Sequence, residues 1–148
     1  MRHEVTTTID APADVVWRAV RDVEKWSDWT PTVTEIQVHG GDEITLGSVA
    51  TVRQPKQPAR EWTVTELVDG RSFTWTSRGP GLRFAADHTV TVKGEGEAGG
   101  GRTTVELTFA VAGPLAPLAS LLAGKAIRWA VDTEAASLKK WCEQAARS

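Results

Sequence analysis

The order in which two hydrophobic periodicities follow one another constrains this chain most. Residues 3–9 alternate between apolar and polar side chains, as a strand does, and residues 12–21 carry the apolar face of a short helix. Five or six further alternating runs follow between residues 33 and 111, and residues 115–146 return to a helical period. This order predicts a curved antiparallel sheet packed against a long final helix.

Residues typical of turns separate the alternating runs. The separating segments are Gly40–Gly41, the stretch from Pro55 to Pro58, Asp69–Gly70, the tripeptide GPG at 79–81 and the polar, glycine-rich loop 94–101. Near the N-terminus, Asp10 is predicted to cap the first helix, and residues 22–25 are predicted to form a second short helical turn. The predicted class is α+β, with six to seven strands wrapped around the C-terminal helix and two short helices after strand 1, as a single domain over residues 1–148.

Charge and composition exclude several functions. The chain carries 17 Lys and Arg against 19 Asp and Glu, which argues against a nucleic-acid partner. No apolar run approaches the roughly 18–20 residues that span a bilayer, so we expect no membrane insertion. The first residues lack the apolar core of a secretory signal, and the lone cysteine, Cys142, has no internal disulfide partner. These features predict a cytoplasmic protein in which Cys142 is a small buried hydrophobic residue.

Known catalytic and cofactor-binding motifs are missing from the sequence. Three scattered His residues and one Cys give no metal-ligand spacing, so we predict no metal site. The sequence has neither a GxSxG motif nor a glycine-rich phosphate loop between a strand and a helix, and we predict no cofactor. What remains to explain function is the arrangement of the aromatic and apolar side chains.

Four segments together resemble one superfamily. They are TTTIDAPADVVWRAVRDVEKWSDWTP at 6–31, REWTVTELVDGRSFTWTSRGPG at 60–81, HTVTV at 88–92 and EAASLKKW at 134–141. In this order they resemble the START/Bet v 1-like (SRPBCC) helix-grip superfamily, in particular its bacterial polyketide cyclase/dehydrase-like branch, over essentially the whole chain. The resemblance implies that the sheet grips the last helix and that the gap between them holds an apolar ligand. None of the segments is specific for one reaction.

The two-residue period then assigns side chains to the inner face of the sheet. In the longest alternating run Leu82, Phe84, Ala86, His88, Val90 and Val92 share one face, which should point inward. On the final helix, one side is more apolar than packing on the sheet requires. The predicted ligand-binding residues are Trp26, Trp29, Trp62, Phe73, Trp75, Phe84, His88, Phe109, Leu118, Leu122 and Trp129. For Trp26, Trp29, Trp62 and Trp75, plain packing in the core is the alternative.

His88 is the polar residue of most interest, because the rest of its strand face is apolar. It can act as an acid or base near neutral pH and is the predicted catalytic residue, or it can be a core histidine bonded to a neighbour. Asp87 cannot face His88, because adjacent strand residues point to opposite sides. Arg53, Arg60 and Arg83 either anchor an anionic ligand group or lie on a solvated face.

Two functions remain open at this stage. The first is the binding of a hydrophobic small molecule, such as a polyketide, a lipid or an aromatic compound, between the sheet and the last helix. The second is an enzyme of the polyketide aromatase/cyclase type that uses the same cavity, with His88 assisting proton transfer. The absence of Tyr, a common proton donor, and of any strong catalytic motif weakens the second. A third possibility is a regulatory or toxin-like interaction protein built on the same scaffold, but the sequence contains no feature that supports it. The sequence specifies neither the ligand nor the oligomeric state.

Overall fold

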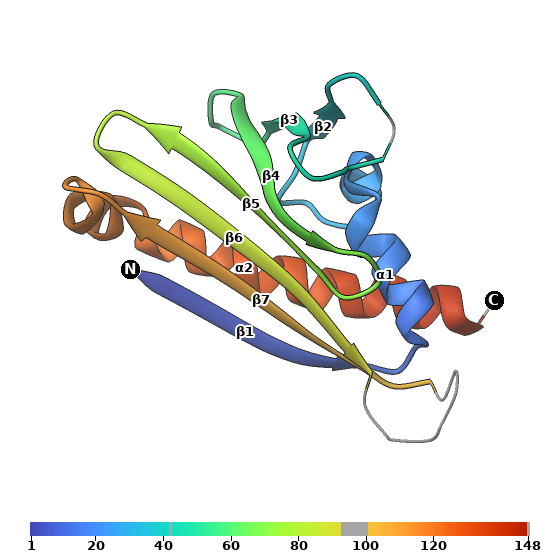
Figure 1. Cartoon of the computed structure of the whole chain (residues 1–148). Helices are drawn as coiled ribbons and strands as arrows, with labels where there is room; N and C mark the ends of the chain where they lie inside the picture. Colours follow the sequence, from blue (N-terminus) through green and yellow to red (C-terminus); the bar gives the residue numbers. More distant parts are fainter. Residues whose placement is uncertain (42, 93–100, 148) are drawn as a thin grey trace.

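One antiparallel sheet forms the body of the molecule in the computed structural model, which describes residues 1–41, 43–92 and 101–147 (Figure 1). Its strands are β1 (Arg2–Ile9), β2 (Glu35–Val38), β3 (Val49–Arg53), β4 (Arg60–Val68), β5 (Ser72–Gly79), β6 (Leu82–Val92) and β7 (Thr103–Ala112). The order across the sheet is β1-β7-β6-β5-β4-β3-β2, so β2 to β7 form a meander and β1 joins its far edge. The predicted loop at 94–101 falls, apart from Gly101, outside the described residues.

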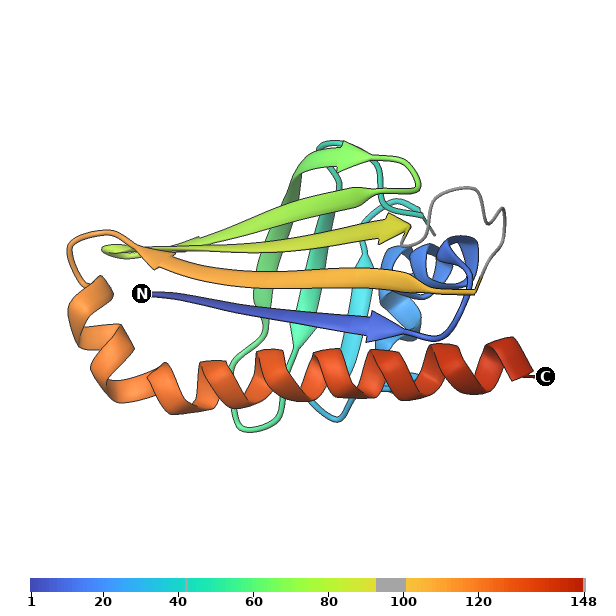
Figure 2. The ribbon, with the colours of Figure 1, turned by 90° about the horizontal axis from the view of Figure 1, so that it is seen from below.

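Three helical segments accompany the sheet. They are α1 (Ala13–Arg21), the 3₁₀ helix η1 (Val23–Asp28) and α2 (Ala116–Arg147). Figure 2 shows α2 running along one face of the sheet, while α1 lies near the C-terminal end of α2. The predicted α+β class, with a long helix gripped by a curved sheet, is confirmed. Over the described residues, no helix combines the length and the apolar character needed to cross a membrane.

Curvature of the sheet is aided by an irregularity in β4. The pairing of β4 with β5 shifts between Val64 and Glu66, as a β-bulge requires. A bulge adds one residue on one strand and increases the local bend and twist. The bend lets β4 and β5 rise over α2 while β1 and β7 stay close to it (Figure 2).

The start of α1 differs from the prediction. The helix begins at Ala13 with Pro12 in the N-cap position and no side-chain cap, so the assignment of Asp10 as the cap is wrong. Asp10 comes too early, and its backbone N–H instead donates a hydrogen bond to Glu143 Oε2 of α2 at 2.9 Å. The Pro12 carbonyl accepts from the N–H groups of Val15 and Val16, which begins the helical bonding.

The C-terminal half of α2 is held firmly to the sheet. Val131, Ala135, Leu138 and Cys142 are buried, which confirms the predicted core role of Cys142. Burial raises the pKa of the Cys142 thiol to about 12, so it stays protonated. Polar contacts add to this packing: Lys139 Nζ donates to the Thr8 carbonyl at 2.8 Å, and His3 Nε2 lies 2.8 Å from Asp132 Oδ1.

The N-terminal end of α2 is fixed to the sheet by the turn between β5 and β6. The Leu115 N–H donates to the Gly81 carbonyl at 3.0 Å. Gly113 has a φ of +107°, and a Cβ placed there would lie 2.5 Å from the Gly81 oxygen. Only glycine fits this close approach of two backbones.

Gly113→Ala should therefore destabilise the protein more than Gly70→Ala. Gly70 also has a positive φ, +80°, but a Cβ there would meet nothing within 4 Å. We expect Gly70→Ala to cost about 1–2 kcal/mol and Gly113→Ala about 1–3 kcal/mol more, because the added methyl group overlaps the backbone of Gly81. Urea unfolding of the two variants measures the difference, and equal midpoints would contradict the close approach.

Candidate functional site

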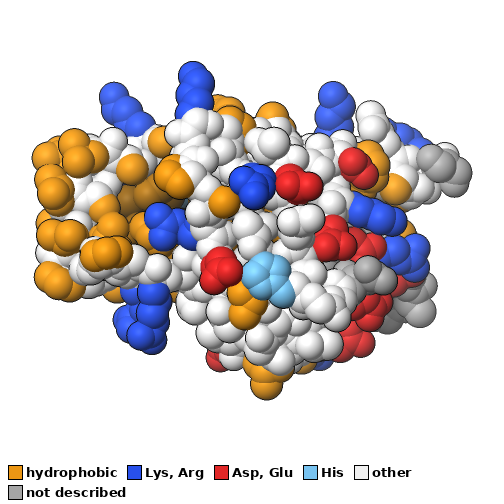
Figure 3. Space-filling view, turned by 90° about the horizontal axis from the view of Figure 1, so that it is seen from above, with side chains coloured by type: hydrophobic (Ala, Val, Ile, Leu, Met, Phe, Trp, Pro, Cys, Tyr) orange, Lys and Arg blue, Asp and Glu red, His pale blue; other side chains and the backbone are white. Residues whose placement is uncertain are grey.

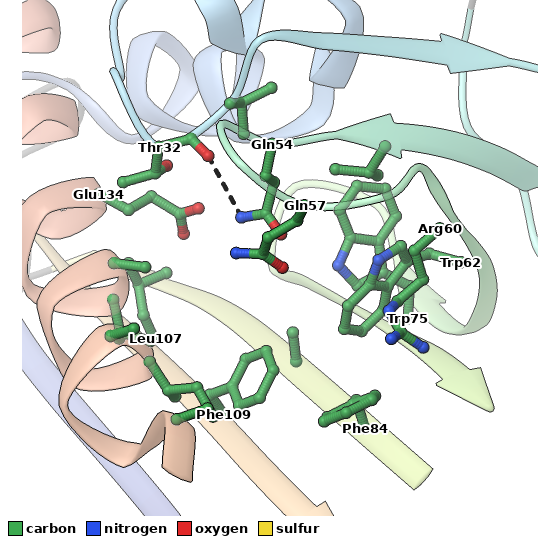
Figure 4. Close-up of a pocket in the computed structure, with 18 of the residues that line it drawn as sticks. Thr32, Gln54, Gln57, Arg60, Trp62, Trp75, Phe84, Leu107, Phe109 and Glu134 are labelled. Carbon is green, nitrogen blue, oxygen red and sulfur yellow. Dashed lines mark hydrogen bonds between the residues drawn. The ribbon is translucent and has the colours of Figure 1, made fainter. Parts of the chain in front are cut away.

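A cavity of about 520 Å³ lies between the inner face of the sheet and α2 (Figure 4). Four alanines of α2 line it, Ala119, Ala123, Ala126 and Ala130, which are spaced 4, 3 and 4 residues apart and so lie on one helix face. Their methyl groups reach only a short way toward the sheet, and the space beneath them stays empty. Cavities of this size are common binding sites for small organic ligands.

Aromatic side chains from successive strands form the wall opposite the helix. Trp62, Trp75, Phe84 and Phe109 come from β4, β5, β6 and β7 and all line the cavity. Neighbouring rings lie close, with centroids 5.8 Å apart for Trp62 and Trp75 and 5.9 Å for Phe84 and Phe109. Such contacts hold the rings in place without a ligand, so the wall is preformed.

Trp26 connects this wall to the short helices. Its indole N–H donates to the carbonyls of Ala19 and Val20 at 3.2 and 3.1 Å, at the end of α1. Its ring lies 5.5 Å from that of Trp75 and 5.4 Å from that of His88. Trp26 thus packs the short helices onto the sheet and lines the cavity at the same time.

Polar groups gather on one side of the cavity. Figure 4 shows the Glu134 side chain pointing toward Gln54 and Gln57, with Thr32 beside them and Arg60 on the opposite side. Gln54 Nε2 donates to the Thr32 carbonyl at 3.2 Å. The cavity therefore has an aromatic portion and a polar portion lined by amide, carboxyl and imidazole groups.

His88 is held as a neutral base in the polar portion. It stacks on Phe73 with ring centroids 4.2 Å apart, and its Nδ1 lies 3.2 Å from the Phe73 carbonyl. That carbonyl can only accept, so Nδ1 carries the proton and Nε2 keeps a free lone pair. Burial lowers the pKa of His88 to about 4. Asp87 lies on the other face of β6, where its Oδ1 accepts from Thr74 Oγ1 at 2.7 Å.

Glu134 faces His88 across the cavity, with Oε2 4.0 Å from His88 Nε2. Burial raises the pKa of Glu134 to about 8, so its carboxyl is mostly protonated at neutral pH. A neutral acid thus faces the lone pair of a neutral base, and a small approach or one water molecule can bridge the gap. Glu134 was not among the residues predicted from the sequence, although its spacing from Val131 and Leu138 puts it on the buried side of α2.

Arg60 lies on the opposite side of the cavity from the polar portion. Its guanidinium carbon is 4.7 Å from the centre of the Phe84 ring, and the side chain is exposed. This position allows a cation–π contact and leaves the N–H groups directed to solvent or to a ligand. Arg53, in contrast, pairs with Glu35 at 3.5 Å on the outer surface.

The structure brings most of the predicted ligand-binding residues together at the cavity. Those that line it are Trp26, Trp62, Trp75, Phe84, His88, Phe109 and Leu122. Phe73 is fully buried behind His88, and Trp29 packs on Trp26 at a ring distance of 5.7 Å. Leu118 and Trp129 are 52% and 58% exposed, because they lie away from the helix face that carries the alanines.

Gln54 and Gln57 are two further cavity residues that were not predicted from the sequence. They lie in and near the turn after β3, and nothing in the hydrophobic pattern indicates that this turn folds over the cavity. Among the described residues, no group of three or more His, Cys, Asp or Glu side chains is placed to hold a metal ion.

The curved sheet, the long gripped helix and the cavity between them define a helix-grip fold, which the match to an SRPBCC-type family model supports. The family model described as polyketide cyclase / dehydrase and lipid transport matches residues 2–143. The chain therefore belongs to this family. Among curated proteins, none matches the chain.

Solved structures share the fold at low sequence identity. The protein XoxI from Bacillus cereus has 12% identity and a TM-score of 0.75, covering 95% of this chain and 94% of its own. A START superfamily protein from Mycobacterium smegmatis has 15% identity and a TM-score of 0.69, with 97% of each chain covered. The protein TTHA0849 from Thermus thermophilus has 18% identity and a TM-score of 0.74, with both chains fully covered.

The pH dependence of stability should reveal the buried carboxyl. The pKa of Glu134 rises from 4.5 to about 8 on folding, so the folded state holds its proton more tightly than the unfolded state. Stability from this group is complete below pH 4.5 and is lost as the pH rises through 8. Relative to Glu134→Gln, we expect wild-type stability to fall by roughly 2–5 kcal/mol over this range.

Urea unfolding of both proteins between about pH 4.5 and 9 measures this difference. The lowered pKa of His88 gives stability that is present above pH 6.5 and is lost as the pH falls toward 4. Both proteins carry His88, so its contribution largely cancels in the comparison. Parallel pH profiles would mean that the Glu134 carboxyl is ionised in the folded state.

Proposed function

We propose that this protein, a single domain in the cytoplasm, binds one hydrophobic small molecule in the cavity between the sheet and α2. The observation that carries the proposal is a preformed space of about 520 Å³ between aromatic rings and a row of alanines. Polyketides, lipids and aromatic compounds all present the apolar surface that such walls bind. Burying about 300 Å² of that surface contributes roughly 7 kcal/mol before the costs of association, which supports useful affinity.

The polar portion of the cavity favours a ligand with a neutral hydrogen-bonding group at one end. A hydroxyl or carbonyl group can pair with the Glu134 carboxyl, the His88 Nε2 atom or the amides of Gln54 and Gln57. A carboxylate is disfavoured there, because it would face the Glu134 carboxyl in a buried setting without a nearby cation. Arg60 lies on the other side of the cavity, so a ligand carrying an anionic group should bind with that group toward Arg60.

Filling the cavity from the helix should block binding. Ala130 is partly buried and lines the cavity, whereas Ala136 is exposed further along α2 and does not line it. We expect Ala130→Phe to weaken the binding of N-phenyl-1-naphthylamine, an uncharged apolar probe, by at least about tenfold, since one ring occupies much of the space. Ala136→Phe is the matched control and should keep the wild-type Kd.

Fluorescence titration of the probe gives both constants. Equal affinity for the two variants would contradict binding in this cavity. Native mass spectrometry of protein purified from its own host complements the titration, because a co-purified ligand would identify the compound class directly.

The pairing of His88 with Glu134 supports a second candidate function, an enzyme of the polyketide aromatase/cyclase type. In a bound β-polyketone, His88 Nε2 would remove a proton from the carbon between two carbonyls, while the Glu134 carboxyl donates its proton to a carbonyl oxygen. The product is an enol held in a folded chain, ready to attack another carbonyl of the same molecule. Most of the rate would come from orientation within the cavity.

Substitution of the pair separates the two candidates. If the protein only binds, His88→Ala and Glu134→Gln should change the ligand Kd by no more than a few fold, and wild-type protein should leave a short β-polyketone unchanged. If it catalyses, either substitution should lower kcat by about 10²–10⁴ with little change in Kd. The cyclised product is followed by its aromatic absorbance. If both variants turn over at the wild-type rate, His88 and Glu134 are excluded as the acid and base.

A further inference from the structure

Large apolar side chains stand exposed along the first half of α2 and just before it. We name as the apolar collar the residues Leu115, Leu118, Leu121, Leu122 and Trp129. Leu121 is 81% exposed and Leu122 is 77% exposed, so neither belongs to the core. Figure 3 shows hydrophobic side chains gathered at one end of the molecule around a hollow. A contiguous exposed apolar surface of this kind usually marks a site of contact with a protein, a membrane or a ligand.

The apolar collar borders the cavity that we assign to the ligand. Leu122 belongs to both, and Ala119, Ala123 and Ala126 line the cavity on the same stretch of helix. Ala123 and Ala126 are also exposed, so the cavity opens to the outside between these turns of α2 and the sheet. Whatever covers the apolar collar therefore also meets the entrance of the cavity.

Positive charge surrounds the apolar collar. Segments 78–86 and 107–131 form this end of the molecule together with residues 2–4 of β1, which pair with residues 108–110. The two segments contain Arg78, Arg83, Lys125 and Arg128 and no Asp or Glu, and the carboxylate of Glu4 beside them is paired with Arg2 at 3.4 Å. All four cations are exposed, and within the described part of the chain none of them forms an ion pair. The whole chain has a net charge of −2, so these cations are segregated at one end.

This positive charge distinguishes between the partners that could cover the apolar collar. A second copy that packed its own apolar collar here would bring two sets of unpaired cations together, which disfavours a symmetric dimer. An anionic partner is favoured, but nucleic acid offers few apolar groups to cover four leucines. Leucines and a tryptophan flanked by Lys and Arg are instead the composition of helices that lie in the interface of an anionic bilayer.

We propose that the apolar collar docks on the surface of an anionic lipid bilayer. The leucines and Trp129 enter the boundary between headgroups and acyl chains, and the four cations lie at the level of the lipid phosphates. The protein remains peripheral, since none of its described helices can span the bilayer. Docking in this orientation turns the cavity entrance to the membrane, so an apolar ligand can move between the two without crossing water; this last step rests on the proposed binding function.

Co-sedimentation with lipid vesicles tests the docking. We expect wild-type protein to bind phosphatidylcholine vesicles that contain about 30% phosphatidylglycerol, and to bind pure phosphatidylcholine at least about tenfold more weakly. Leu121→Asp with Trp129→Asp and, separately, Lys125→Glu with Arg128→Glu should each weaken binding to the anionic vesicles at least about tenfold. The matched control on the same helix, Trp141→Asp with Lys140→Glu, lies outside the apolar collar and should bind as wild type does.

Three results would overturn the proposal. The first is that wild-type protein does not bind anionic vesicles, and the second is that the collar variants bind them as well as the control does. The third is that light scattering shows a stable dimer of the wild-type protein, which the double substitution Leu121→Asp with Trp129→Asp converts to a monomer. Neither Leu121 nor Trp129 lines the cavity, so this double variant should keep the wild-type Kd for N-phenyl-1-naphthylamine. That measurement separates a failure of docking from a failure of the proposed ligand binding.

Discussion

The size of the side chains that α2 directs at the sheet is the constraint on which the rest of the structure depends. Toward its C-terminus, Val131, Leu138 and Cys142 fill the space beneath the helix, and Lys139 bonds to β1. Toward its N-terminus, alanines replace these larger residues, and the sheet bends away at the bulge in β4. A single helix thus holds the fold together with one half and leaves an open cavity with the other.

An empty cavity of this size is stable only because its walls support one another. Trp26, Trp75, Phe73 and His88 form one group of rings in mutual contact, and the indole N–H of Trp26 is bonded to the end of α1. Each ring is therefore held by protein neighbours on its outer side and does not collapse inward. The same rigidity reduces the ordering that a ligand would have to impose, which favours binding.

Burial sets the charge state of the two polar groups that face each other. An ion pair of His88 and Glu134 would need both groups to be charged away from water, and at 4.0 Å the attraction does not offset that cost. Both groups are therefore neutral, with the proton on the carboxyl and a lone pair on the imidazole. This arrangement suits a ligand that offers a hydroxyl or a carbonyl, whether it is only bound or also transformed.

Much of the fold followed from the sequence, because strand and helix periods are local properties that successive residues express directly. The inward positions of Phe84 and His88 on β6 also followed from parity alone, whereas Val92, which was assigned to the same face, is 62% exposed at the end of the strand. The turn that carries Gln54 and Gln57 could not be placed in this way, because its position depends on how the sheet curves. Glu134 was missed for another reason: its spacing places it on the buried side of α2, but the sequence does not show that a carboxyl there is kept protonated, because its raised pKa comes from burial in the folded structure.

The position of the apolar collar matters as well as its composition, because the apolar collar borders the entrance of the cavity. A hydrophobic ligand that leaves a membrane for a protein must pass an entrance, and a strip of water at that entrance costs about 25 cal/mol for each Å² of apolar surface it wets. Leu122, which belongs to both the apolar collar and the cavity wall, makes the apolar surface continuous from the outside to the interior. Had the leucines been at the other end of α2, where Lys139 bonds to β1 and Glu143 bonds to the segment that follows β1, the same patch would have no path to the cavity. The alanine row and the leucine row are therefore two sides of one helical segment, one leaving space for the ligand and the other facing the medium from which an apolar ligand would come.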